Sequence, residues 1–287
     1  MDVRSPCEGL STELTAEQPP DASIVATLNY IIDTGSPAVL YVDSPEREVM
    51  PPSYAEHMMA VRDGRPFRRT FELDVHGFVL VDHPTQVKDF LDERERTNIY
   101  VRELQELVQR HSSASEVLVY DHTVRTSDQH SQRDAGVRRA VKRVHNDYTE
   151  LSARKRLRST VGFADAERWL QRRWAIIQVW RPISSPVLVA PIGICDGRSV
   201  RRQNLVRVER RYRDRTGENY QVSYDPAHQW FYFPQMVRHE ALLFKTFDSD
   251  LGVPSRFTPH SAFDVPGTPA GAPARESIES RAFAFFD

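Results

Sequence analysis

The stretch Ala175-Ile-Ile-Gln-Val-Trp180, followed by Val187-Leu-Val-Ala-Pro-Ile-Gly-Ile-Cys195, indicates the fold class of this chain. Both runs are rich in β-branched and apolar residues, and both have the length of buried strands. Comparable short runs, separated by Gly, Pro, Asn or Asp, cover residues 205–212, 220–224, 230–233, 241–247 and 278–286. Many short strands with turn signals between them favour a mainly β sandwich or jelly roll over a parallel α/β sheet.

The rest of the chain has a more mixed character. Residues 1–22 contain few large apolar side chains and end in Pro19-Pro20, which predicts a flexible tail. Further predictions are strands at 23–31, 67–81 and 117–120, helices at 86–111 and 164–173, and a mobile polar loop at 127–136. We therefore expect a single domain over residues 23–287, with a mixed α/β flanking part at 23–126 and a β core at 137–287.

The charge balance limits the kinds of partner. Lys and Arg number 38 against 40 Asp and Glu, and a net charge of −2 gives no overall attraction to nucleic acid or to a membrane surface. The basic runs at 154–158 and 201–215 are interpreted as a solvated face or a lid beside the active site. Cys7 and Cys195 cannot build a disulfide framework, and no export signal or apolar span is recognisable, so we expect a cytoplasmic protein.

The segment Val144-His145-Asn146-Asp147 contains the pattern His-x-Asp. Residues i and i+2 of a strand point to the same face, so both side chains can reach one ion. His260 lies 115 residues downstream (260 − 145) and is the candidate for a third ligand. Two imidazoles and one carboxylate leave open positions that suit non-haem iron(II) better than zinc. The alternative is that Asp147 caps a turn or pairs with Arg154.

The open positions on an iron(II) ion would take dioxygen and a bidentate keto acid such as 2-oxoglutarate. The C-terminal segment contains a candidate binding site for this cosubstrate. Arg275-Glu276-Ser277 precedes the last predicted strand, and an arginine can hold the distal carboxylate of 2-oxoglutarate through two hydrogen bonds. Ser277 can add a further hydrogen bond from the same strand face. Arg281 shares that face and is the second candidate for the clamp, while a solvated polar edge is the alternative for the whole segment.

Three further residues are candidates for binding the substrate. Arg181 can bind a carboxylate of substrate or cosubstrate, or form a structural pair with Asp196 or Glu218. Tyr220 and Tyr232 belong to an aromatic-rich stretch that either lines a substrate cavity or packs in the core. No catalytic residue beyond the metal ligands is predicted.

Several segments together carry a family resemblance. They are Val144-His-Asn-Asp-Tyr-Thr149, Val179-Trp-Arg-Pro-Ile183, Pro191-Ile-Gly-Ile-Cys-Asp196, Gly217-Glu-Asn-Tyr220, Pro226-Ala-His-Gln-Trp230, Tyr232-Phe-Pro234, Glu240-Ala-Leu-Leu-Phe-Lys-Thr-Phe-Asp-Ser249, Arg256-Phe-Thr-Pro-His-Ser-Ala-Phe263 and Arg275-Glu-Ser-Ile-Glu-Ser-Arg281. Residues 117–286 strongly, and 24–116 loosely, resemble the hydroxylase/desaturase family that includes fungal gibberellin-desaturase-like proteins and the cephamycin methoxylation component. One departure is Gln178, where the family pattern leads us to expect asparagine.

The resemblance implies a double-stranded β-helix, a cupin-like jelly roll of the 2-oxoglutarate oxygenase type. It also implies iron(II) bound by His145, Asp147 and His260, and hydroxylation or desaturation of a small specialised metabolite with dioxygen. Two other hypotheses stay open: a non-catalytic jelly-roll protein that assists a partner enzyme, and a non-oxidative metal enzyme of the same fold. The substrate and the oligomeric state are not predicted.

Overall fold

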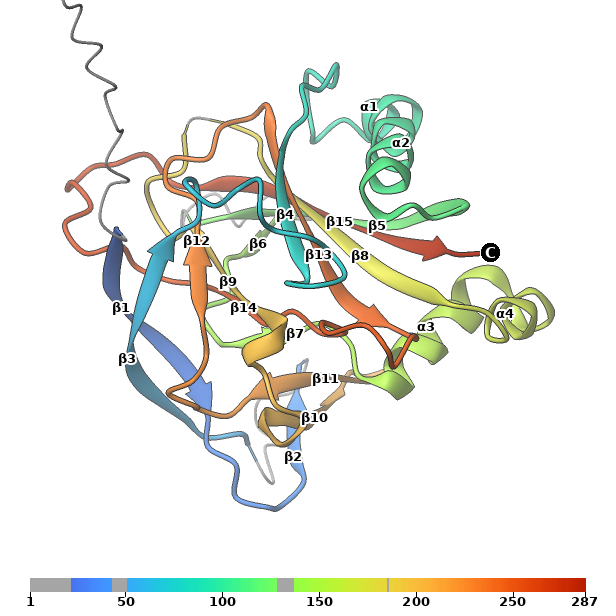
Figure 1. The fold of residues 1–287 in the computed structure, drawn as a ribbon, viewed down its shortest axis with the longest axis horizontal. Helices are drawn as coiled ribbons and strands as arrows, with labels where there is room; N and C mark the ends of the chain where they lie inside the picture. Colours follow the sequence, from blue (N-terminus) through green and yellow to red (C-terminus); the bar gives the residue numbers. More distant parts are fainter. Residues whose placement is uncertain (1–21, 43–50, 128–136, 185) are drawn as a thin grey trace, which may run out of the picture.

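The computed structural model describes residues 22–42, 51–127, 137–184 and 186–287. These residues form two facing β-sheets with helices outside them (Figure 1). The larger sheet has the strand order β1 (Ser23–Ile31), β3 (Tyr54–Asp63), β12 (Trp230–Tyr232), β9 (Ile192–Cys195), β14 (His260–Ala262), β7 (His145–Asn146), β11 (Thr216–Val222), β10 (Leu205–Arg211) and β2 (Ala38–Tyr41). The smaller sheet has the order β4 (Phe78–Asp82), β13 (Glu240–Asp248), β8 (Trp174–Pro182), β15 (Glu276–Phe285), β5 (Glu116–Thr126) and β6 (Val137–Arg139).

Neighbouring strands in both sheets come from distant parts of the chain. The order β9-β14-β7-β11 brings together segments from residues 145 to 262, and β4 pairs with β13 across more than half of the sequence. This arrangement of two curled sheets confirms the predicted mainly β jelly roll. Strands β1, β2 and β3 belong to the larger sheet, and β4 and β5 belong to the smaller one. The predicted flanking part, residues 23–126, therefore contributes strands to both sheets.

The helices cover the smaller sheet on its outer face and at one end (Figure 1). Helix α1 (Glu93–Glu95), a π-helical turn (Arg96–Tyr100) and α2 (Val101–Ser112) run in succession, while α3 (Glu150–Val161) and α4 (Phe163–Trp169) lie near the ends of β8 and β15. Short 3-10 turns occur at Gly197–Ser199 and Arg202–Asn204. None of the helices in the described part of the chain is long and apolar enough to cross a membrane.

Strands β8 and β13 are buried at every position, because the smaller sheet is covered on both faces. On the inner face, Trp180 and Phe244 pack against Ile194 and Phe231 of the larger sheet. On the outer face, Val179 and its neighbours pack against the apolar side of α2. A strand buried on both faces reads as a continuous apolar run, which explains the sequence Ala175-Ile-Ile-Gln-Val-Trp180.

Several boundaries differ from the sequence predictions. The predicted strand at 67–81 is wrong except for its end, because residues up to Gly77 form turns and Gly77 has a φ of +92° beside Thr258. The helix predicted at 86–111 begins at Glu93, where Asp92 accepts a hydrogen bond from the backbone N–H of Arg94. Before it, the N–H groups of Gln86 and Lys88 bond to the side chains of Glu103 and Glu95 instead.

Several elements have no counterpart among the sequence predictions, among them β2, β3, β6, β14 and α3. The strand predicted at 23–31 is confirmed as β1, and the strand predicted at 117–120 extends over the whole of β5. The predicted tail, apart from residue 22, and the predicted loop at 127–136, apart from residue 127, lie outside the described residues.

Candidate metal centre

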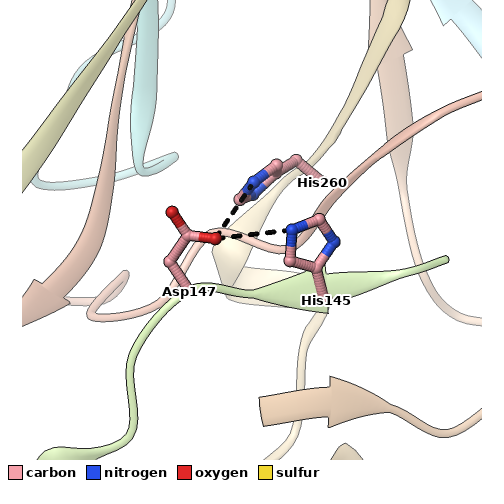
Figure 2. Close-up of side chains that lie close together, drawn as sticks. All are labelled: His145, Asp147 and His260. Carbon is pink, nitrogen blue, oxygen red and sulfur yellow. Dashed lines mark ion pairs between the residues drawn. The ribbon is translucent and has the colours of Figure 1, made fainter. Parts of the chain in front are cut away.

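The structure brings together the three residues that were predicted from the sequence as metal ligands. His145 on β7 and His260 on β14 are directly paired across neighbouring strands, and their ring centroids lie 4.4 Å apart. Asp147 follows β7, and its Oδ1 lies 3.4 Å from Nε2 of His145 and 3.9 Å from Nε2 of His260 (Figure 2). One ligand atom from each residue lies within 4.8 Å of the others, so the three can hold one ion.

Backbone carbonyl groups orient both imidazole rings. Nδ1 of His145 lies 2.8 Å from the carbonyl oxygen of Arg143, and Nδ1 of His260 lies 3.2 Å from that of Thr258. A carbonyl oxygen only accepts, so Nδ1 carries the proton in each ring and the lone pair of Nε2 faces Asp147. Burial lowers the pKa of His260 to about 4. His260 is therefore neutral at physiological pH, as a metal ligand must be.

The Asp147 carboxylate is ionised and is held from its other side by Arg281. Burial raises the pKa of this carboxyl, but the pKa lies well below its usual range, chiefly because of the charge of Arg281. Arg281 donates from Nε to Oδ2 of Asp147 at 2.8 Å. The ion pair leaves Oδ1 directed toward the histidines. Neutral imidazoles and one carboxylate are the donor set that non-haem iron(II) takes.

Asn146, the middle residue of the His-x-Asp pattern, links three chain segments through hydrogen bonds of its side chain. Its Nδ2 donates to the carbonyl oxygens of Tyr148 and Thr246, both at 2.8 Å. Its Oδ1 accepts from the backbone N–H of Thr258, two residues before His260. The side chain thus ties β7 to β13 and to the segment that leads into β14. This role of Asn146 was not predicted, although its place inside the His-x-Asp pattern was visible in the sequence.

Arg275 borders a narrow cavity together with both histidines, and Ser277 shares its strand face; each carries a buried polar atom that has no partner among the described residues. Arg275 is 3% exposed and Ser277 is fully buried. Nη1 of Arg275 donates to the carbonyl oxygen of Ala190 at 2.7 Å, but its Nε and the Oγ of Ser277 have no hydrogen-bond partner among the described residues. Buried polar groups are nearly always satisfied in folded proteins. These two therefore fit an anionic ligand such as the distal carboxylate of 2-oxoglutarate.

The space next to Arg275 is narrow in this conformation. A cavity of about 10 Å³ is lined by Arg275, both histidines, Trp180 and Glu279, among others. Burial lowers the pKa of Arg275 to about 10, so the guanidinium stays charged at neutral pH. A diacid of the size of 2-oxoglutarate enters this space only if neighbouring side chains move. Arg275 nevertheless borders the cavity that both histidines line, and its Nε has no hydrogen-bond partner among the described residues.

Arg281, the second candidate for the clamp, is already engaged by carboxylates. Besides Asp147 it contacts Asp121 at 2.9 Å and Glu279 at 3.4 Å. These partners hold Arg281 beside the metal ligands and leave Arg275 as the better candidate for the cosubstrate. The alternative pairing of Asp147 with Arg154 is replaced by the pair with Arg281.

Arg181 does not belong to the site, and both interpretations of it were wrong. It is fully buried on the helix-covered face of β8, where its guanidinium donates to the carbonyl oxygens of His83 and Arg238 and contacts the Tyr100 hydroxyl. Asp196 and Glu218, the expected partners, instead pair with Arg198 and Arg207. Arg181 joins the loop after β4 to the segment before β13.

Tyr220 and Tyr232 also point away from the metal centre. Tyr220 is opposite Asn146 on the neighbouring strand, so it shares the face of Asn146 and not that of His145. Tyr232 is opposite Gly193, whereas His260 is opposite Ile194, the next residue of β9. Because successive strand residues alternate in direction, Tyr232 lies on the other face of the sheet. The prediction that these tyrosines line the substrate cavity is wrong.

The residues next to Tyr220 line the site instead. Gln221 is opposite His145, and Asn219 lies two residues away on the same face. Both border a cavity of about 430 Å³ that also contains His145, Asp147 and Arg281. Their amide oxygens are buried and have no hydrogen-bond partner in the described structure. The alternation of side chains along the predicted strand at 220–224 could have indicated Gln221, if it had been known which face of that strand is turned toward His145.

Gln178, the departure from the family pattern, also faces this region. It is fully buried on β8, opposite Arg281 on β15 and Phe244 on β13. Neither atom of its amide has a partner among the described residues. Phe244 packs on His260 with 4.7 Å between ring centroids, so Gln178 lies in the layer of side chains next to the metal ligands.

A second and larger cavity opens from the same centre. Its volume is about 830 Å³, which is within the range of small-molecule sites. It shares Asp147, Arg281 and Asn219 with the cavity that contains His145, and extends between α3 and the hairpin of β10 and β11. The basic runs at 154–158 and 201–215 contribute Lys155, Arg156 and several arginines to its walls.

This chain is similar in sequence to known proteins over most of its length. A family model described as "Oxidoreductase/YMDC permease-like domain" matches residues 28–285. The hydroxylase/desaturase CTB9 of Cercospora beticola is 32% identical over 255 residues, which cover 82% of this chain and 78% of that protein. The Fe(II)/2-oxoglutarate-dependent dioxygenase nvfI of Aspergillus novofumigatus is 31% identical, with 81% and 84% covered. The hydroxylase/desaturase efuI of Hormonema carpetanum is 33% identical, with 82% and 85% covered.

A solved structure agrees with these similarities. The iron and alpha-ketoglutarate-dependent endoperoxidase NvfI superposes with a TM-score of 0.84 at 26% identity, over 92% of this chain and 97% of that one. Fold, sequence and the donor set of the site thus point to the same cofactor, iron(II), and the same cosubstrate. The chain belongs to this oxidoreductase family and, within it, to the hydroxylase/desaturase group of non-haem iron(II)- and 2-oxoglutarate-dependent dioxygenases.

Proposed function

We propose that this chain hydroxylates or desaturates a small specialised metabolite, with iron(II) held by His145, Asp147 and His260. The observation that carries the proposal is the convergence of two imidazole nitrogens and one carboxylate oxygen within 4.8 Å of one another, next to a cavity large enough for a metabolite. Arg275 and Ser277 are proposed to bind the distal carboxylate of 2-oxoglutarate.

Iron(II) with 2-oxoglutarate supplies the oxidation of an unactivated C–H bond by dioxygen. The residues of this chain hold and shield the reactants. The carbonyl groups of Arg143 and Thr258 accept from Nδ1 of the two imidazoles and so direct Nε2 of both rings inward. Arg281 keeps Asp147 ionised and positions its carboxylate. Phe244 and Trp180 close the inner side of the site against water.

A cytoplasmic protein without a nucleic-acid or membrane partner remains part of the proposal. The basic runs support it, because many of their arginines are ion-paired within the protein: Arg158 with Glu167, Arg201 with Asp225, Arg207 with Glu218 and Arg211 with Glu209. Paired guanidinium groups contribute little to a surface that attracts polyanions. Cys195 is a buried free thiol, as expected in a reducing compartment.

The decisive experiment combines metal analysis with cosubstrate turnover. Protein reconstituted with iron(II) under anaerobic conditions is expected to hold one iron per chain. On admission of air it should convert 2-oxoglutarate to succinate slowly, without any added substrate. His145→Ala should lose both properties, whereas His228→Gln, which alters a buried histidine outside the triad, should keep them. Iron-free protein without succinate formation would instead support the accessory-protein hypothesis, and tightly bound zinc without oxygen consumption the non-oxidative one.

A further inference from the structure

The walls of the large cavity carry more basic than acidic side chains. Arg138, Lys155, Arg156, Arg207, Arg210, Arg215 and Arg281 line it, against Asp121, Asp147, Glu209 and Glu218. Each of these acids is already bound by an arginine: Asp121 and Asp147 by Arg281, Glu218 by Arg207, and Glu209 by Arg211. Seven basic side chains against four carboxylates leave a positive excess at the cavity wall.

Arg210 is the basic residue of this set with a buried donor that lacks a partner among the described residues. It lies on β10 opposite Gly217, and it shares a sheet face with Val208, which is opposite Asn219. Its Nε is buried and has no hydrogen-bond partner among the described residues. The guanidinium lies 5.9 Å from the ring centroid of Tyr212. Arg210 also borders both cavities that contain Asp147.

This arginine is separate from the candidate clamp for 2-oxoglutarate. Arg275 precedes β15 in the smaller sheet and lines the narrow cavity beside Trp180, whereas Arg210 belongs to the larger sheet and borders only the two wide cavities. His145 lines both the narrow cavity and the cavity of about 430 Å³. His145 therefore borders one cavity with Arg275 and another with Arg210.

We infer that the substrate carries an anionic group, most simply a carboxylate, and that Arg210 binds it at the wide cavity with Arg138 beside it. The inference rests on the proposed function and names the substrate class for that site. A buried guanidinium N–H without a partner is costly, and a carboxylate matches the planar fork of arginine with two parallel hydrogen bonds. The remainder of the substrate then extends toward Asp147 and the histidines, past Asn219 and Gln221.

The test measures the binding of matched probe pairs to the holoprotein. Protein loaded with iron(II) and saturating 2-oxoglutarate, kept anaerobic so that no turnover occurs, is titrated with a panel of aromatic and alicyclic carboxylic acids and their primary amides. 2-Naphthoate and 2-naphthamide are one such pair, and 2-naphthyl phosphate distinguishes a phosphate from a carboxylate. Carboxylates should bind more tightly than their amides by about tenfold to a hundredfold, the range for hydrogen bonds to a charged group.

The variants separate a specific contact from a general charge effect. Arg210→Gln should remove the preference for carboxylates, and Arg210→Lys should restore part of it. Arg211→Gln is the matched control, because Arg211 is the next residue of the same strand, faces the other way and pairs with Glu209. It removes the same charge and should leave the preference intact.

Each contrary outcome has a distinct meaning. If no carboxylate in the panel binds more tightly than its amide, or if Arg211→Gln acts as strongly as Arg210→Gln, the inference is overturned. It is also overturned if Arg210→Gln weakens 2-oxoglutarate binding and leaves the probes unaffected, because Arg210 then serves the cosubstrate. Succinate formation by the same preparation in air separates the two proposals. Without it the proposed function fails, and with it but without carboxylate preference only the present inference fails.

Discussion

Arg281 and Asp147 form an ion pair in which the two carboxylate oxygens of Asp147 have different partners. Nε of Arg281 donates to Oδ2 at 2.8 Å, while Oδ1 faces the Nε2 atoms of both histidines. Arg281 is itself held by Asp121 and Glu279, so the position of Asp147 is determined by two further strands of the smaller sheet, β5 and β15. Partners of metal ligands of this kind tune both ligand orientation and metal affinity.

Replacing Arg281 by Gln should therefore weaken iron(II) binding about 10- to 100-fold, the usual cost of losing such a partner. At saturating iron the 2-oxoglutarate requirement should stay normal. Arg281→Lys keeps the charge but loses the planar fork, and it should recover part of the affinity. An iron titration of the three proteins measures this. A raised 2-oxoglutarate requirement at unchanged iron affinity would instead make Arg281 the cosubstrate clamp.

Arg275→Lys should have the opposite effect, namely a raised 2-oxoglutarate requirement with unchanged iron binding. Loss of one partner in a charge-assisted contact within a partly dry pocket costs roughly 2–5 kcal/mol, so the apparent 2-oxoglutarate requirement should rise by about one to three powers of ten. Iron binding should be spared, because Arg275 has no contact with the ligands that the structure shows. Ser277→Ala should give a smaller rise. Succinate formation at varied 2-oxoglutarate concentration is the measurement, and a normal requirement in Arg275→Lys excludes Arg275 as the clamp.

Asp147→Ala removes the single anionic member of the triad, and turnover should be abolished. Arg281 keeps Asp121 and Glu279 as partners, so the free energy of unfolding should fall only by about 1–3 kcal/mol, the cost of a lost partner for a buried polar group. Circular dichroism and urea unfolding of the metal-free protein check the fold, and succinate formation checks the activity. Wild-type activity in this variant would contradict the assignment of the ligands.

Gln178→Met should leave the metal-free protein as stable as the wild type, or stabilise it by about 1 kcal/mol. Gln178 is fully buried and neither amide atom has a described partner, so an apolar residue of similar volume loses no hydrogen bond within the protein. Gln178→Asn, the residue of the family pattern, is the comparison for substrate preference. A clear loss of stability in Gln178→Met on urea unfolding would show that the amide has a structural partner.

The stability of the metal-free protein should fall on mild acidification, in part through His228. Burial lowers the pKa of His228 to about 4, while an unfolded chain has a histidine pKa near 6.5. The contribution is therefore fully present above pH 6.5 and is lost as the pH falls toward 4, because the unfolded chain binds the extra proton. His228→Phe keeps a ring beside Tyr30, with which His228 stacks, and removes this proton uptake. Between pH 7.5 and 5 the variant should lose about 2 kcal/mol less than the wild type on urea unfolding. Equal losses would assign the acid sensitivity to other groups.

The jelly roll and the triad were predictable from local patterns. Short apolar runs between turn residues describe strands wherever they pair, and His-x-Asp on a strand needs only the period of two to place both side chains on one face. The helix at 86–111 was recognised but began too early, because Gln86 and Lys88 satisfy their N–H groups with distant glutamate side chains. Such contacts leave no periodic signal in the sequence.

The direction of individual side chains was harder to predict. Tyr220 and Gln221 are adjacent, and only the pairing with β7 shows that Gln221 is the one that faces His145. Arg181 is on a strand buried on both faces, so hydropathy does not distinguish its helix-covered side from the inner side. Strand register decides both cases, and register depends on pairings between segments far apart in the chain.

The direct pairing of His145 with His260 has a consequence for folding. The two residues close a loop of 115 residues (260 − 145), so the pair forms only after much of the jelly roll has assembled. An ion that binds there recognises the native chain and not the unfolded one, and it shifts the folding equilibrium by mass action. At a free iron concentration of 100 times the dissociation constant, the gain is about 2.7 kcal/mol. Cellular iron supply thereby acts on the lifetime of the folded polypeptide as well as on its chemistry.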